Sequence, residues 1–289
     1  MCDEFTAKAE EAALVSQGVS RRTFAALGAV AAVAACSGPS NGQTASLSER
    51  TVRIPTPDGS ADAFFVYPAK GRHPGVVFWP DVGGLRDAFM VMGRRLAGAG
   101  YAVLVVNQYY RGAAAPVLSS FSEWRTPEGQ AKLKPLIAGV TSEGTMRDAA
   151  AFVGFLDKQP QVDPARRIGT QGYCMGGAHA VRTATAAHAR VGAVATFHGG
   201  GLASDKPDSP HLLLPRTQAS YLIAVAQNDD AKDPAEKERF RAAAKAAGRP
   251  AEIEVYPADH GWCVPDTPIY NQVQADRAWE RLLALYAKL

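Results

Sequence analysis

Short apolar runs that alternate with longer amphipathic stretches constrain the fold of this chain more than any other feature of the sequence. Runs rich in β-branched or aromatic residues are predicted strands, at 51–55, 62–67, 75–79, 102–107, 167–171, 191–197, 221–226 and 252–256. Stretches between and after them are predicted helices, at 86–99, 144–158, 175–187, 234–247 and 271–289. This alternation predicts an α/β fold, a doubly wound and mostly parallel eight-stranded sheet flanked by helices.

The N-terminal part of the chain has a different character. The Arg21-Arg22 pair precedes an apolar run of about 13 residues that ends in small side chains. That run is shorter than the roughly 20 residues of a membrane-spanning helix, so it predicts an export signal over 1–36. Residues 37–48, rich in Gly, Pro, Ser and Asn, indicate a linker. The remainder, 49–289, is long enough for a single α/β domain.

Two motifs in the predicted signal suggest how it is read. Residues 20–24 (SRRTF) resemble a twin-arginine signal, and 33–36 (VAAC) resemble a lipoprotein cleavage box in which Cys36 would carry the lipid. We therefore expect an exported protein, periplasmic or anchored in a membrane and facing the periplasm. A disordered extension on a cytoplasmic protein is the alternative. The formal net charge is +3 and the chain has no Lys/Arg run, so nucleic acid is not an expected partner.

A tight turn after the predicted strand 167–171 carries the most distinctive chemistry. The sequence QGYCMGG, residues 171–177, places Cys174 among three glycines. A strand that turns sharply into a helix strains the residue at the bend, and neighbours without side chains make that bend possible. The bend aims the thiol out of the carboxyl edge of the sheet, and the helix N-terminus favours its thiolate. Cys174 is therefore a predicted nucleophile. A buried structural cysteine is the alternative.

A cysteine nucleophile needs a base and an acid that orients the base. Asp229 follows the predicted strand 221–226, and His260 follows the predicted strand 252–256. The chain order of nucleophile, acid and base is the order that this kind of fold uses. Asp230 is an alternative acid, and Asp229 is preferred because it follows its strand by the shorter turn.

Beyond the triad, several motifs resemble the dienelactone hydrolase family of the α/β-hydrolase fold, over residues 50–289. The matching stretches are GYCMGG at 172–177, ND at 228–229, HGW at 260–262, WPDVGG at 79–84 and NQYYR at 107–111. The resemblance implies that Cys174, His260 and Asp229 open lactones or cleave esters without a metal or cofactor. It also implies an oxyanion hole built from the backbone N–H groups of Met175 and Val82.

The same resemblance marks candidate substrate-binding residues. Arg111 matches an arginine that binds the substrate carboxylate, although a surface cation paired with a nearby acid is an equal alternative. Asp81 stands where the family has a glutamate near the resting thiol, and Val264 stands where it has a second arginine. Trp262 is a further candidate for lining the pocket. The departures make dienelactone itself an unexpected substrate and favour another ester, lactone or thioester.

The function predicted from the sequence is hydrolysis of an ester or lactone through an acyl-enzyme intermediate by a monomer. A thioesterase or peptidase with the same triad is one alternative, and a non-catalytic envelope lipoprotein that binds ligands is another.

Cys263 lies three residues after His260, so a disulfide with Cys174 is a further hypothesis. His198 is interpreted as a strand-end histidine near the pocket rim. Residues 108–143 show neither the apolar spacing of a helix nor that of a strand, and are predicted to form a functional loop or a cap over a pocket.

Overall fold

The computed structural model describes residues 46–289. The predicted export signal over 1–36 and most of the predicted linker over 37–48 lie outside the described residues. Leu47 and Ser48, at the end of that linker, belong to the first strand. In this part of the chain, no helix is long and apolar enough to cross a membrane.

Within the described residues, eight strands form one sheet, as the apolar runs predict. They are β1 (Leu47–Thr56), β2 (Gly59–Pro68), β3 (Gly75–Trp79), β4 (Ala102–Val106), β5 (Ile168–Tyr173), β6 (Val191–Phe197), β7 (Ser220–Ala226) and β8 (Ala251–Tyr256). Their order across the sheet is β1-β2-β4-β3-β5-β6-β7-β8. β2 pairs antiparallel with β1 and with β4, and the other neighbours are parallel. The carboxyl ends of the parallel strands therefore share one edge of the sheet.

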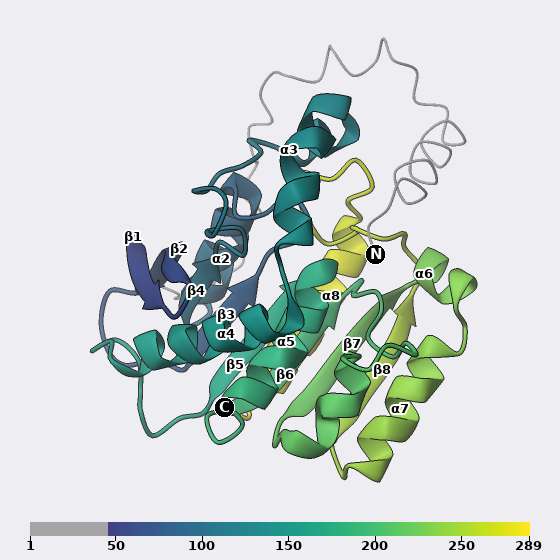
Figure 1. Ribbon diagram of the computed structural model, residues 1–289. Coiled ribbons are helices and arrows are strands. Elements are labelled where there is room, and N and C mark those ends of the chain that lie inside the picture. Colours follow the sequence, from purple (N-terminus) through teal and green to yellow (C-terminus); the bar gives the residue numbers. More distant parts are fainter. Residues whose placement is uncertain (1–45) are drawn as a thin grey trace, which may run out of the picture.

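Helices cover both faces of this sheet (Figure 1). The α-helices are α2 (Asp87–Gly98), α3 (Pro127–Ala138), α4 (Ser142–Asp157), α5 (Met175–Ala186), α6 (Gln227–Lys232), α7 (Glu236–Ala246) and α8 (Gln272–Tyr286), and the 3₁₀ helices are η2 (Phe121–Arg125) and η3 (Pro210–Arg216). α4, α5 and α7 pack on one face, and α2 and α8 pack on the other. Alternate strand residues serve the two layers: Val77 and Trp79 of β3 join the first, and Val76 and Phe78 join the second. Burial on both faces explains why the strands are almost continuously apolar.

The segment 108–143 contains more helix than the sequence predicts, because it includes η2 and the whole of α3. It packs Trp124 into a small apolar cluster with Val82 and Tyr109, which lie at the carboxyl edge of the sheet. The predicted cap is therefore an ordered helical layer over the loop that follows β3.

Candidate active site

A sharp bend between β5 and α5 holds Cys174. This residue has φ 53° and ψ −123°, a left-handed backbone conformation that residues with side chains rarely adopt. Its backbone N–H donates to the carbonyl oxygen of Phe197 at 3.1 Å, which ties the bend to the end of β6. The side chain is buried. The backbone therefore has the geometry of a nucleophile elbow.

Two glycines beside Cys174 allow the bend because other backbone segments approach them closely. A Cβ atom on Gly172 would lie 1.9 Å from the carbonyl oxygen of Gly176. A Cβ atom on Gly176 would lie 2.5 Å from the carbonyl oxygen of Pro80, in the loop after β3. A side chain at either position would force these backbone segments apart.

His260 and Asp229 form a hydrogen-bonded pair at the ends of the neighbouring strands β8 and β7. Nδ1 of His260 lies 2.6 Å from Oδ2 of Asp229. An ionised carboxylate only accepts hydrogen bonds, so Nδ1 carries the hydrogen and Nε2 remains able to take a proton. The backbone N–H of His260 also donates to Oδ1 of Asn228 at 2.9 Å, which fixes the loop that carries the histidine.

Asp230, the alternative acid, is engaged elsewhere. Nζ of Lys237 donates to its Oδ1 at 2.5 Å. Asp229 and Asp230 both lie in the first turn of α6, where the sequence predicts only a turn. The helical geometry separates the two carboxylates, so that Asp229 alone of the two bonds to His260.

His198 lies between the elbow and the His260–Asp229 pair. It directly follows Phe197, and its ring centroid is 4.7 Å from that of His260. Its backbone is also left-handed, with φ 42°, and its side chain is buried. Burial first, and then the neighbouring His260, hold the pKa of His198 well below its usual value. His198 therefore ends its strand, as interpreted from the sequence, and it is a neutral, buried ring packed against His260.

Tyr109 connects the two residues expected to supply the oxyanion hole. Its hydroxyl donates to the carbonyl oxygen of Val82 at 2.8 Å and lies 3.3 Å from Sδ of Met175. Among residues 46–289, the backbone N–H groups of Val82 and Met175 donate to no other group. Uncommitted N–H groups are what an oxyanion hole requires. The sequence alone indicates no role of its own for Tyr109; its place just after β4, at this edge of the sheet, is the signal that could have identified it.

A buried ion-pair network links the loop after β3 with the loop after β8. Arg86 donates from Nη1 to Oδ1 of Asp81 at 2.7 Å and from Nε to Oδ2 of Asp266 at 2.7 Å. The Arg86 side chain is fully buried. Oδ1 of Asp81 also accepts from the backbone N–H of Gly83 at 2.8 Å. The network holds the Val82 loop against the loop that carries His260.

The match to a known family accords with this geometry. A model of the dienelactone hydrolase family matches residues 61–289, most of the chain. The chain belongs to the dienelactone hydrolase family. It is therefore a hydrolase by family, and its eight-stranded sheet with flanking helices is the α/β-hydrolase fold.

Individual relatives of this dienelactone hydrolase family member are distant but span nearly the whole domain. A protein of Methylorubrum extorquens named "Putative carboxymethylenebutenolidase" is 27% identical over 237 residues, which are 80% of this chain and 78% of that protein. A Synechocystis protein with the same name is 25% identical over 84% of this chain and 98% of its own length. The crystal structure of a "Putative Dienelactone Hydrolase" from Klebsiella pneumoniae has a TM-score of 0.72 at 22% identity, covering 84% of this chain and 100% of that chain. This last likeness shows the shared fold.

Two residues that the family resemblance marks for substrate binding have other partners in the structure. Arg111 pairs with Asp58 at 2.6 Å and with Asp148 at 2.8 Å. Binding a substrate carboxylate would require Arg111 to give up one of these acids, as the paired-cation alternative anticipates. Asp81 is likewise paired with Arg86, at 2.7 Å. To contact a substrate or a thiol, its carboxylate would have to leave that ion pair.

Trp262 and Cys263 belong to the packing behind the His260 loop. Trp262 is fully buried in the core, with its ring stacked on Tyr256 at 5.2 Å and packed edge-on against His198 at 5.2 Å. Cys263 is a buried free thiol, and burial raises its pKa well above the usual value. The hypothesised disulfide between Cys263 and Cys174 is therefore not formed. In the described part of the chain, no three His, Cys, Asp or Glu side chains gather as a metal site requires.

Proposed function

We propose that this protein hydrolyses a carboxylic ester or lactone through nucleophilic attack by Cys174. The observation that carries the proposal is the left-handed bend at Cys174, at the same sheet edge as the His260–Asp229 pair. The names of the curated relatives, carboxymethylenebutenolidases, support a lactone or ester as the substrate class. A bend with this strain has little structural purpose unless its side chain acts.

In the proposed first step, the thiolate of Cys174 attacks the carbonyl carbon and forms a tetrahedral oxyanion. The N-terminus of α5 stabilises the thiolate, since Cys174 directly precedes Met175, the first residue of that helix. The backbone N–H groups of Met175 and Val82 donate to the oxyanion. When the intermediate collapses, the bond between the carbonyl carbon and the leaving oxygen breaks, which releases the alkoxide and leaves a thioester on Cys174.

His260 would move the protons in both steps. It takes the proton of the Cys174 thiol at Nε2 and gives it to the leaving alkoxide. In the second step it removes a proton from water, whose hydroxide attacks the thioester and releases the acid. Asp229 stabilises the positive charge that the ring carries between these transfers, because its carboxylate already accepts from Nδ1.

We propose that the substrate is an ester or lactone without a strictly required carboxylate. Arg111 has two acidic partners, and Val264 stands where a second carboxylate-binding arginine would lie. To bind a substrate with two carboxylates, the site would need Arg111 released from an acidic partner and an arginine in place of Val264. Dienelactone itself is therefore a poor candidate.

A substrate panel tests the proposal. Protein purified under reducing conditions is assayed with p-nitrophenyl esters of increasing acyl length, simple lactones, acyl thioesters and peptide amides. The expected result is turnover of esters or lactones. Thioesters cleaved in strong preference to their oxygen esters would make the protein a thioesterase. Absence of turnover on the whole panel by folded, reduced protein would favour a binding role.

We also propose that the protein is exported and lies in the periplasm or on a membrane that faces it. The support is the sequence alone, from the Arg21-Arg22 pair to Cys36. Mass spectrometry of the mature N-terminus tests it. Cleavage before Cys36 with a lipid on that residue is the expected result for an anchored form, and an intact Met1 in the cell would contradict export.

A further inference from the structure

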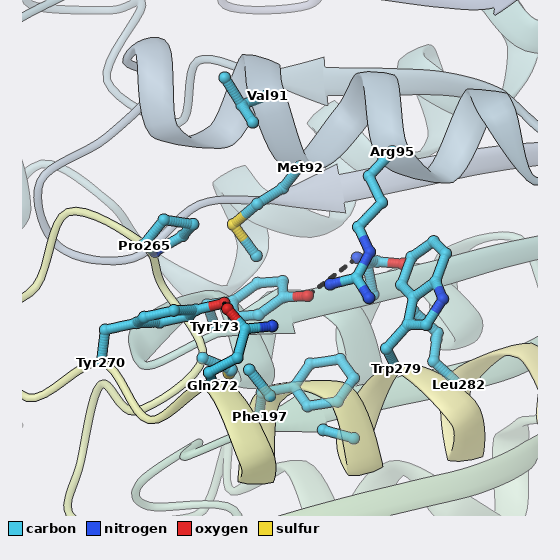
Figure 2. A pocket seen from close by; sticks show the side chains of 14 residues that line it. Val91, Met92, Arg95, Tyr173, Phe197, Pro265, Tyr270, Gln272, Trp279 and Leu282 are labelled. Atoms are coloured by element: carbon cyan, nitrogen blue, oxygen red, sulfur yellow. Dashed lines mark hydrogen bonds between the residues drawn. The ribbon is translucent and has the colours of Figure 1, made fainter. Parts of the chain in front are cut away.

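A cavity lies on the face of the sheet that α2 and α8 cover. Its volume is about 250 Å³, and its walls come from α2, β5, β6, α8 and the loop between β8 and α8. Figure 2 shows Met92 and Arg95 reaching from α2 towards Tyr173, Phe197 and Trp279. Cys174, Asp229 and His260 do not line this cavity. It is therefore separate from the space in which the proposed hydrolysis takes place.

The volume and the walls of the cavity fit a small ring. Met92, Phe197 and Leu282 provide apolar surface. An apolar cavity of roughly 150 Å³ already binds benzene in a protein core, so this one can hold a single ring with a short substituent. Burial of such a ring is favourable at about 25 cal/mol per Å² of apolar surface.

Two buried polar groups in the wall lack part of their hydrogen bonding. With the Gln171 amide oriented as it is here, its Nε2 donates to the Tyr173 hydroxyl at 3.2 Å. Oε1 of Gln171 has no partner within residues 46–289, although the side chain is only 2% exposed. The hydrogen of the Tyr173 hydroxyl likewise donates to no group in that part of the chain. A buried acceptor left unpaired costs about 1–3 kcal/mol, so these two groups favour an occupant that pairs with them.

One hydroxyl group satisfies both requirements. A ligand O–H can donate to Oε1 of Gln171 while its oxygen accepts from the Tyr173 hydroxyl. A carboxylate has no hydrogen to offer Gln171, and a hydrocarbon leaves both protein groups unpaired. The two groups therefore favour an alcohol or phenol over a carboxylate or a hydrocarbon.

The charge at the mouth of the cavity also favours an uncharged ligand. Arg95 donates to Asp276 at 2.9 Å, and its guanidinium lies 4.3 Å from the ring centre of Trp279. Because Asp276 offsets the charge of Arg95, the entrance presents a neutral pair and not an isolated cation. An anionic ligand would therefore gain little attraction from Arg95.

We propose that this cavity binds a small uncharged phenol or aromatic alcohol. Its hydroxyl lies between Gln171 and Tyr173, and its ring lies between α2 and α8. The inference does not depend on the role of Cys174 in hydrolysis. Cys263 and Pro265, on the loop that follows His260, form part of the wall, so the ligand would contact the loop that carries the proposed base.

The test uses p-cresol as the probe and the Cys174→Ala protein, in which no acyl transfer can occur. Isothermal titration calorimetry measures binding of p-cresol, of p-xylene as the isostere without a hydroxyl, and of 4-methylbenzoate as the anion. We expect p-cresol to bind and the other two to bind at least about tenfold more weakly, the equivalent of one lost hydrogen-bond pair. Equal or tighter binding of p-xylene or 4-methylbenzoate would overturn the proposal, as would no heat from p-cresol up to its solubility limit.

Variants and a chemical reporter locate the bound probe. Ala278 lines the cavity and is buried, whereas Ala284 lies on the exposed side of the same helix. We expect Ala278→Leu to abolish p-cresol binding and Ala284→Leu to preserve it. Tyr173→Phe, which removes one oxygen atom, should weaken binding by about tenfold even if the larger substitution disturbs folding.

Cys263 reports occupancy directly because its thiol lines the cavity. Saturating p-cresol should slow the reaction of Cys263 with methyl methanethiosulfonate, with the modified peptide identified by mass spectrometry. An unchanged rate at Cys263, or unchanged affinity in Ala278→Leu, would show that p-cresol binds elsewhere and would overturn the proposal.

Discussion

Arg86 and Asp266 are 180 positions apart in the chain and meet through two parallel hydrogen bonds. Nε of Arg86 lies 2.7 Å from Oδ2 of Asp266, and Nη2 lies 2.8 Å from Oδ1. The other side of the guanidinium binds Asp81, next to Val82. One buried cation therefore joins the proposed oxyanion loop to the loop that follows His260. This contact fixes the position of the Val82 loop relative to the loop that carries His260.

Replacing Arg86 with methionine should destabilise the protein strongly. Asp81 would keep its burial but lose its cation, and removing one partner of a buried ion pair costs about 3–5 kcal/mol. Urea denaturation followed by circular dichroism gives the free energy of unfolding. Arg94→Met is the matched control, because Arg94 pairs with Glu49 at the surface and such pairs contribute about 0–1 kcal/mol. Similar losses in the two variants would contradict the role given to the buried network.

The choice between Asp229 and Asp230 has a simple kinetic test. Asp229→Asn should lower kcat by about 10²–10⁴-fold, because the imidazolium formed at His260 would lose its carboxylate. Asp230→Asn removes only the Lys237 pair and should leave kcat within about twofold, since such a pair contributes little. A larger loss in Asp230→Asn than in Asp229→Asn would reverse the assignment.

Tyr109 should affect turnover more than substrate binding. Tyr109→Phe leaves the Val82 carbonyl without its donor, so the loop that supplies one oxyanion N–H is less well held. We expect kcat to fall by about tenfold, less than the loss of an oxyanion donor itself, with little change in KM. The neighbouring hydroxyl of Tyr110 bonds to Asp148 and Thr56, away from the loop, so Tyr110→Phe is the control. Equal effects of the two substitutions on kcat would argue against a positioning role for Tyr109.

Buried neutral histidines should make the fold sensitive to acid. Burial first, and then Arg182, lower the pKa of His179 to about 3, from about 6.5 in the unfolded chain. In the unfolded state His179 thus binds a proton below about pH 6.5, whereas in the folded state it binds one only below about pH 3. Stability is present above about pH 6.5 and is lost as the pH falls, by about 1.4 kcal/mol per pH unit for each such histidine.

Urea denaturation at about pH 7.5 and about pH 5.5 measures this loss. In His179→Met the loss of stability between these two pH values should be smaller than in the parent protein by about 1 kcal/mol. His188→Met is the control, since His188 is exposed. An identical pH dependence in the parent and His179→Met would rule out the buried neutral histidine as a source of acid sensitivity.

The strands and the elbow could be predicted because their signals are local. A strand buried on both faces must be apolar throughout, and a strand that bends sharply into a helix needs glycine where backbones touch, as at Gly172 and Gly176. The helices of the cap had no such signal: α3 covers a small cluster around Trp124 and lacks a long apolar stripe.

Side-chain partners were harder to predict because they come from distant parts of the chain. Arg111 meets Asp58 of the β1–β2 turn and Asp148 of α4, and no local pattern links these positions. Trp262 lies two residues after His260 in the same loop, yet its ring is buried in the core. Proximity in sequence to a proposed catalytic residue therefore did not indicate exposure to a substrate.

The central claim is that Cys174 is the nucleophile, and replacing it tests that claim most directly. Hydrolysis of the best p-nitrophenyl ester is measured for the parent protein and for Cys174→Ala, with circular dichroism to verify that the variant folds. The parent protein should also yield an acylated Cys174 peptide when the reaction is quenched early. We predict that Cys174→Ala abolishes turnover and the acyl adduct together. Turnover in the variant within about tenfold of the parent would contradict a cysteine nucleophile, because loss of a true nucleophile costs far more.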